Sequence, residues 1–115
     1  MAHDKAYFAA EEIIEKIRLS KAKELTLRVD LNASDEAKLT ELPESIKKLT
    51  WLKKLDLSGN NLSILPDWID AFSKLESLDV SRNKLTELPK WWERLIQLQE
   101  LDLSDNQLTA LPESL

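Results

Sequence analysis

Three aspartates recur at a fixed spacing of 23 residues, at Asp56, Asp79 and Asp102. On neighbouring strands of a parallel sheet they would lie about 4.8 Å apart and form one column. Carboxylate oxygens are the preferred ligands of hard cations, so such a column has the chemistry to attract one. A row of three carboxylates on an open surface makes no closed site, however. We therefore expect neither a metal ion nor a cofactor at this column.

Residues suited to catalysis are scarce. The single histidine, His3, lies at the chain terminus, and there is no cysteine. No serine has a base at a recognisable spacing. Gly59 is the only glycine, so a G-x-x-x-x-G-K-[ST] phosphate loop is absent from these residues. The sequence predicts a protein that is not an enzyme.

The spacing of the aspartates belongs to a longer repeat. The chain reads LKKLDLSGNNL from Leu52, LESLDVSRNKL from Leu75 and LQELDLSDNQL from Leu98. Each stretch fits the pattern L-x-x-L-x-L-x-x-N-x-L, with Val80 as the only apolar residue other than leucine. The same period places Pro43, Pro66, Pro89 and Pro112, and also Leu39, Leu62, Leu85 and Leu108. Copies that stay in phase in this way indicate a repeat architecture.

These motifs closely resemble the leucine-rich repeat family, in its 23-residue intracellular and bacterial class. The resemblance covers about residues 22–115. It implies an α/β fold, a right-handed solenoid with a parallel sheet on its concave face and looser helical turns on its convex face. It also implies a scaffold that binds other proteins, although a fold fixes architecture better than function.

Within one repeat the pattern changes from strand to helix. Leu55 and Leu57 alternate with polar residues, which predicts a short strand, whereas Leu65, Ile69 and Phe72 have helical spacing. We expect parallel strands near residues 24–28, 54–57, 77–80 and 100–103. One coil cannot bury its own leucines, so neighbours must stack. Asn60, Asn83 and Asn106 are expected to satisfy backbone groups of the adjacent coil.

Residues 1–21 precede the repeats and predict a helix that caps them. Asp4 is a suitable N-cap residue. We expect an apolar face that covers the first coil, formed by Phe8, Ala10, Ile13 and Ile17 with Ile14 and Leu19 beside them. The alternative, a helix that binds a membrane surface or a partner, would usually be basic, and this helix is not.

Residues 22–115 make about four repeats, of which the first is irregular and the last incomplete. Leu39 arrives seven residues late, so an insertion lies within RVDLNASDEAK, where Asp30 falls on the asparagine position. This segment is either a plain insertion or a contact element. At the other end Leu111 and Leu115 are not exchanged for polar residues. We expect a fragment of a longer chain, or self-association through this uncapped edge.

The concave face is the predicted binding surface. Its exposed strand positions form three polar columns without aromatic anchors. A net charge of −5 argues against nucleic acid and favours a partner protein with a basic surface. The predicted contact residues are Arg28, Lys54, Asp56, Ser58, Asp79, Ser81, Glu100, Asp102 and Ser104.

The tryptophans offer an alternative binding surface on the convex side. Trp68 and Trp91 align with Ser45 and Ser114, a position expected to face solvent. They either pack over their neighbours or form an aromatic patch that docks a partner. Trp51 also falls on a solvent position, whereas Trp92 falls in a core column and is expected to be buried.

The cellular setting follows from what the sequence lacks. The absence of cysteine favours a reducing compartment, the cytoplasm. The N-terminus has no apolar signal region, and no apolar run approaches the roughly 20 residues needed to span a bilayer.

We predict a protein-binding scaffold. The alternative is the repeat segment of a larger regulatory enzyme such as a GTPase, since a cap followed by repeats is similar to the start of bacterial Roco-type proteins.

Overall fold

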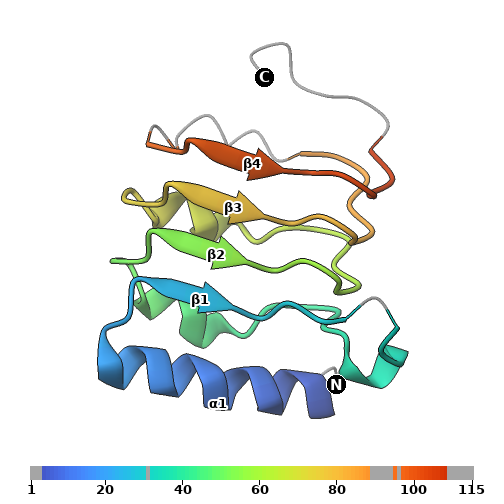
Figure 1. The fold of residues 1–115 in the computed structure, drawn as a ribbon, viewed down its shortest axis with the longest axis horizontal. Helices are drawn as coiled ribbons and strands as arrows, with labels where there is room; N and C mark the ends of the chain where they lie inside the picture. Colours follow the sequence, from blue (N-terminus) through green and yellow to red (C-terminus); the bar gives the residue numbers. More distant parts are fainter. Residues whose placement is uncertain (1–3, 31, 89–94, 96, 109–115) are drawn as a thin grey trace.

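The fold is a stack of four coils closed at one end by a helix (Figure 1). The structure, a computed structural model, describes residues 4–30, 32–88, 95 and 97–108. Its elements, in chain order, are α1 (Lys5–Ser20), β1 (Glu24–Thr26), η1 (Asp35–Ala37), η2 (Glu44–Lys48), β2 (Lys54–Asp56), η3 (Asp67–Ala71), β3 (Ser77–Asp79) and β4 (Glu100–Asp102), where η denotes a 3₁₀-helix.

The strands form one parallel sheet in the order β1-β2-β3-β4. Leu25, Leu55, Leu78 and Leu101 are paired across it in register. Each strand begins where the sequence predicted and ends one or two residues earlier. The ladder nevertheless continues past β1, because the backbone N–H of Leu27 donates to Asp56 and that of Val29 donates to Ser58. The predicted α/β repeat solenoid with a parallel sheet is confirmed.

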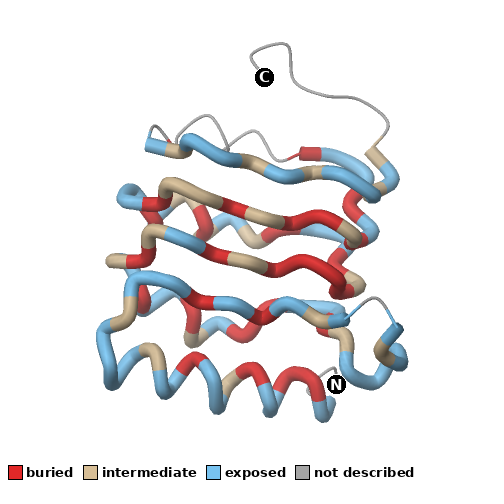
Figure 2. The backbone as a smooth tube through the Cα atoms, in the orientation of Figure 1, coloured by how far each residue is buried: buried red, intermediate tan, exposed pale blue. Residues whose placement is uncertain are grey.

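The 3₁₀-helices η2 and η3 lie behind the sheet, whereas η1 lies beside α1 (Figure 1). The core lies between the strands and the pair η2 and η3. Ile46 and Ile69 point into this core from η2 and η3 and are fully buried. Leu55 and Leu57 are buried from the strand side. Figure 2 shows buried positions in β2 and β3, in the middle of the stack, and none in β4. We call the outward side of the sheet the concave face and the side of η2 and η3 the convex face.

Helix α1 caps the first coil. The carboxylate of Asp4 accepts a hydrogen bond from the backbone N–H of Tyr7 (3.1 Å), as the N-cap prediction requires. The helix ends at Lys21, which has a left-handed conformation (φ 59°) and whose N–H donates to the carbonyl of Ile17. No helix among the described residues is long and apolar enough to cross a membrane.

The buried face of α1 differs from the predicted one. Ala6, Tyr7, Ala10 and Ile14 are buried and Ile17 is partly buried, whereas Phe8, Ile13 and Leu19 are exposed. Tyr7, Ala10, Ile14 and Ile17 follow the helical spacing of three and four and form one stripe. The prediction was right for Ala10, Ile14 and Ile17 and wrong for Phe8, Ile13 and Leu19, which lie off this stripe. The small side chains of Ala6 and Ala10 permit a close approach to the first coil.

Trp51 contacts the segment that connects α1 to the sheet. Its indole Nε1 donates a hydrogen bond to the carbonyl of Ala22 (2.9 Å), and Nζ of Lys21 lies 4.6 Å from a ring centroid of the same indole. The residue is therefore half-buried. The solvent position expected for Trp51 is wrong, because the chain reversal at Lys21 brings the end of the helix over it. Trp92 lies outside the described residues.

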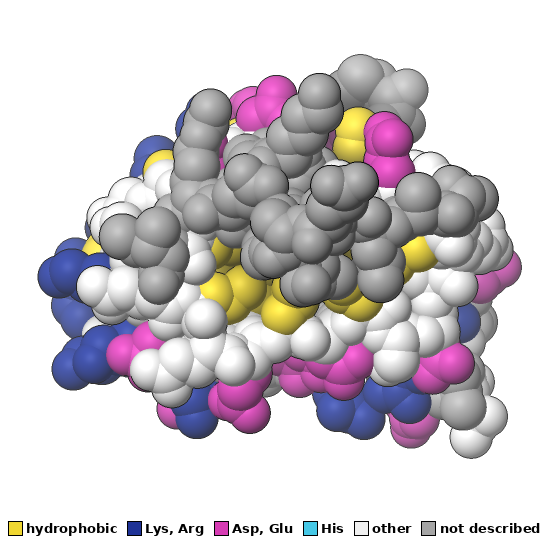
Figure 3. All heavy atoms as spheres, turned by 90° about the horizontal axis from the view of Figure 1, so that it is seen from above, with side chains coloured by type: hydrophobic (Ala, Val, Ile, Leu, Met, Phe, Trp, Pro, Cys, Tyr) yellow, Lys and Arg dark blue, Asp and Glu magenta, His cyan; other side chains and the backbone are white. Residues whose placement is uncertain are grey.

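The opposite end of the stack is less covered. β4 is the outermost strand, and Leu101 and Leu103 are only partly buried, unlike Leu55 and Leu57. Leu98 and Leu108 are partly buried in the same way. Seen from this end, apolar side chains are visible between the residues that the structure does not describe (Figure 3). The expected self-association through this edge stays a prediction.

Candidate functional site

The concave face presents the predicted columns of polar residues. In the first column Glu24, Lys54, Ser77 and Glu100 are paired across the sheet, and in the second Thr26, Asp56, Asp79 and Asp102 are paired. Their apolar neighbours Leu55 and Leu78 point into the core. A shallow hollow of about 260 Å³ lies over β1, β2 and β3, lined by residues of both columns.

Each aspartate of the second column is held by the serine two residues later. Oδ1 of Asp56 accepts hydrogen bonds from the backbone N–H (3.0 Å) and the hydroxyl (2.7 Å) of Ser58. Asp79 makes the same two bonds with Ser81, and Asp102 makes them with Ser104. The three carboxylates are therefore oriented before any partner arrives. At Asp102 the hydrogen bonds from Ser104 also hold the pKa of the carboxyl below its usual value.

These bonds correct the third predicted column, which consists of Arg28, Ser58, Ser81 and Ser104. Ser58 and Ser81 were expected to be exposed, but both are buried. The chain turns after each aspartate, so the serine hydroxyl points back at the carboxylate instead of outward. Arg28 and Ser104 are exposed, as expected. The exposed polar surface of the concave face is thus narrower than predicted.

The asparagines behind the sheet join each coil to the one before it. Oδ1 of Asn60 accepts from the backbone N–H of Leu39 (2.8 Å), while Nδ2 donates to the carbonyls of Leu27 (3.1 Å) and Leu57 (3.0 Å). Asn83 and Asn106 repeat this pattern one and two coils further on. The structural role predicted for the asparagines is confirmed.

The aspartate column does not converge on a point. In the part of the chain that the structure describes, no three acidic or histidine side chains gather in a way that would hold a metal ion. Parallel strands keep the three carboxylates in a row about 4.8 Å apart. The geometry suits contacts spread along a partner's surface better than one enclosed ligand.

A groove that the sequence did not reveal opens at the α1 end of the sheet. It has a volume of about 470 Å³ and lies between α1, the end of β1 and the inserted segment that contains η1. The insertion packs against α1 and forms one wall. The late arrival of Leu39 was the only sequence signal for this feature. It located the insertion without showing what the insertion would enclose.

On the convex face Trp68 belongs to η3 and is half-buried. Its ring meets that of Phe72 edge to face, with centroids 6.2 Å apart and an interplanar angle of 69°. Trp68 thus packs against the core as well as facing solvent. Trp91, the other residue of the alternative binding patch, lies outside the described residues.

Comparison with known proteins agrees with this geometry. The family model described as leucine rich repeat matches residues 35–85 and 52–108. A solved structure of a leucine-rich repeat protein from Leptospira interrogans is 47% identical with a TM-score of 0.62. The match covers 65% of this chain and 19% of that one, so the chain spans about a fifth of that protein's length. No curated protein matches the chain.

Proposed function

The chain belongs to the leucine-rich repeat family, and from this premise we propose that its concave face binds a partner protein with a basic surface. Leucine-rich repeats are in general protein-interaction modules. The observation that carries the proposal is the row of carboxylates at Asp56, Asp79 and Asp102, each fixed by its serine. Groups that are already oriented lose little conformational freedom when they bind, which favours association.

The charge of the concave face selects the partner. Five of its residues are acidic, namely Glu24, Asp56, Asp79, Glu100 and Asp102, against two basic ones, Arg28 and Lys54. Complementary charges increase the rate of encounter and disfavour acidic competitors. Such contacts weaken as salt is added, because the charges lie at the surface.

Isosteric neutralisation of the row tests the proposal. Asparagine at positions 56, 79 and 102 keeps an Oδ1 acceptor for each serine and removes three charges. Glu44→Gln, Asp67→Asn and Glu87→Gln remove three charges from exposed positions off the concave face and serve as the matched control. Lysate from the source organism is passed over both immobilised triple variants and over the unmodified chain, and retained proteins are quantified by mass spectrometry.

We expect a basic protein that the unmodified chain and the control variant retain and that the concave triple variant loses. Calorimetry with the purified protein should then give a dissociation constant that rises by at least tenfold in the concave variant and that rises with salt. If the concave variant retains every protein as well as the control does, the concave proposal is wrong.

The alternative, a repeat segment of a larger regulatory enzyme, would use the same surface to recruit a partner to that enzyme. The length of the native reading frame distinguishes the two. A cytoplasmic location remains a proposal and rests on the absence of cysteine.

A further inference from the structure

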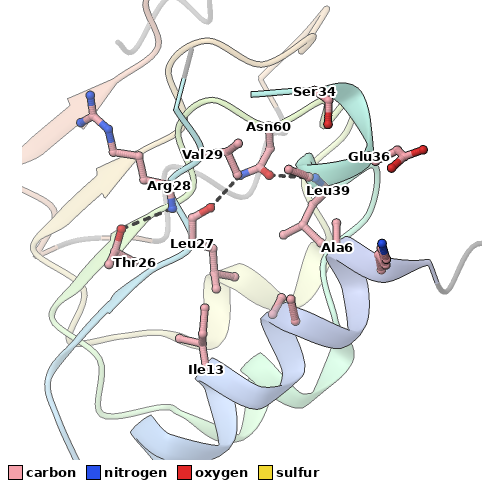
Figure 4. Close-up of a pocket in the computed structure, with 14 residues that line it drawn as sticks. Ala6, Ile13, Thr26, Leu27, Arg28, Val29, Ser34, Glu36, Leu39 and Asn60 are labelled. Carbon is pink, nitrogen blue, oxygen red and sulfur yellow. Dashed lines mark hydrogen bonds between the residues drawn. The ribbon is translucent and has the colours of Figure 1, made fainter. Parts of the chain in front are cut away.

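The groove beside α1 has apolar walls and a charged rim (Figure 4). Ala6, Ala9, Ala10 and Ile13 line it from α1, Leu27 and Val29 from the segment that follows β1, Ala37 from the insertion and Leu39 from the position just after it. Glu36 lies at the rim in Figure 4, and Lys5 also belongs to the lining. Arg28 also borders the groove, but its guanidinium extends away from it in Figure 4. Ile13, one of the lining residues, is a large apolar side chain that is 40% exposed.

The side-chain amide of Asn60, which lines the groove, is already satisfied. Asn60 uses its amide to bind the backbone of Leu27 and Leu39, as the dashed lines in Figure 4 show. Water in the groove therefore finds few partners, and an apolar occupant displaces it at little cost. The volume of about 470 Å³ falls within the range of small ligand sites and exceeds that of one large side chain.

The groove is continuous with the concave face. Thr26 lines the groove and is paired with Asp56, which is paired in turn with Asp79. At a strand spacing of about 4.8 Å, these carboxylates lie roughly 5 and 10 Å from Thr26 along the stack. An extended chain advances about 3.3 Å per residue. A segment that leaves the groove along the concave face would thus bring residues about two and three positions further on beside the aspartates.

We propose that this groove receives an apolar side chain from a basic peptide segment of the partner. The segment would place a leucine, methionine or aromatic residue between α1 and the insertion, and lysines or arginines over Asp56 and Asp79. This inference rests on the proposed function of the concave face and adds to it the anchor that the face lacks. Interfaces depend on a few anchors in well-packed pockets, and in the described part of the concave face no aromatic side chain supplies one.

The chain offers a matched pair of variants for the test. Ala37 and Ala71 are both exposed and are the last residues of η1 and η3. Ala37→Phe fills the groove, whereas Ala71→Phe adds the same side chain on the convex face. Ala9→Phe fills the groove from α1 and keeps the test valid if Ala37→Phe disturbs the insertion. Circular dichroism and melting curves establish that each variant is folded.

A library of random 12-residue peptides on phage is panned against the whole chain, and enriched peptides are synthesised with a fluorescent label. We expect an apolar residue with a lysine or arginine about two or three positions away. By fluorescence anisotropy the dissociation constant should rise at least tenfold in Ala37→Phe and in Ala9→Phe, and less than twofold in Ala71→Phe. Replacing the apolar residue of the peptide by alanine should have an effect of similar size.

The outcomes separate this inference from the function on which it rests. The enriched peptides could bind the asparagine triple variant more weakly and yet bind Ala37→Phe and Ala9→Phe with unchanged dissociation constants. The groove proposal would then be wrong, and the concave function would stand. Enrichment of no peptide at all would also overturn the groove, while the lysate experiment would still decide the concave function. Self-association that Ala37→Phe abolishes would assign the groove to a second copy of the chain and overturn the peptide.

Discussion

Gly59 lies so close to Val29 that a Cβ atom added to the glycine would be 2.0 Å from the carbonyl oxygen of Val29. Gly59 also has a positive φ of 77°. The matching positions of the next two coils, Arg82 and Asp105, have similar angles (53° and 56°) and carry side chains. The backbone angle alone therefore does not demand glycine. Glycine is required at position 59 because the backbone of the first coil, at Val29 just before the insertion, lies in contact with this turn of the second coil.

Gly59→Ala should destabilise the fold by about 2 kcal/mol or more, because the backbone of Val29 must move. Arg82→Ala is the matched control, since it leaves an existing Cβ in the equivalent turn and should cost under about 0.5 kcal/mol. Urea unfolding followed by circular dichroism measures both. Equal losses in the two variants would contradict the role assigned to the close approach.

Sequence alone predicted the sheet and its register, because a repeat that stays in phase leaves one way to stack. The pairing of Asp56 with Asp79 and the bonds of Asn60 follow from that period. Ser58 was misplaced because strand alternation was extended past the point where the chain turns. The groove escaped prediction because its walls come from α1, β1 and the insertion, whose mutual arrangement no periodicity encodes.

Asn60→Ala should cost about 3 kcal/mol. It removes a buried amide and leaves the N–H of Leu39 and the carbonyl of Leu27 without that partner, and each buried unsatisfied group costs roughly 1–3 kcal/mol. Asn61→Ala is the control, because the hydrogen bond of Asn61 to Asp35 is long (3.4 Å) and exposed. Thermal melting of the two variants should differ by several degrees. Similar melting temperatures would show that the hydrogen bonds of Asn60 to the preceding coil contribute little to the stability of the fold.

Ile14 and Ile13 are adjacent in α1 but differ in burial, at 2% and 40% exposed. Ile14→Ala should destabilise the chain by about 3 kcal/mol, because it opens a cavity between the cap and the first coil. Ile13→Ala should cost under about 1 kcal/mol, since Ile13 faces the groove.

Deletion of residues 1–20 should expose core leucines and cause unfolding or aggregation. A truncated chain that melts like the full one would show that α1 is no cap.

The hydrogen bonds from Ser104 to Asp102 should weaken at low pH. They lower the pKa of Asp102 in the folded chain. The stability that they contribute is therefore present above the unfolded pKa and is lost as the pH falls through the folded pKa, below about pH 4. Ser104→Ala should raise the midpoint of the Asp102 carboxyl in a carbon-detected NMR titration. Ser63→Ala, at an exposed position elsewhere, should leave it in place.

Trp68 tests whether the convex face binds or only packs. Trp68→Ser restores the residue found at Ser45 and removes the edge-to-face contact with Phe72. Because Trp68 is half-buried, we expect a loss of about 2 kcal/mol in the free energy of unfolding. If its role is packing, the dissociation constant of the partner should stay within twofold of that of the unmodified chain. The same measurement on Trp91→Ser extends the test to the second residue of the alternative patch. A loss of 2 kcal/mol or so in binding energy, with the concave asparagine variant unaffected, would move the binding surface to the convex face.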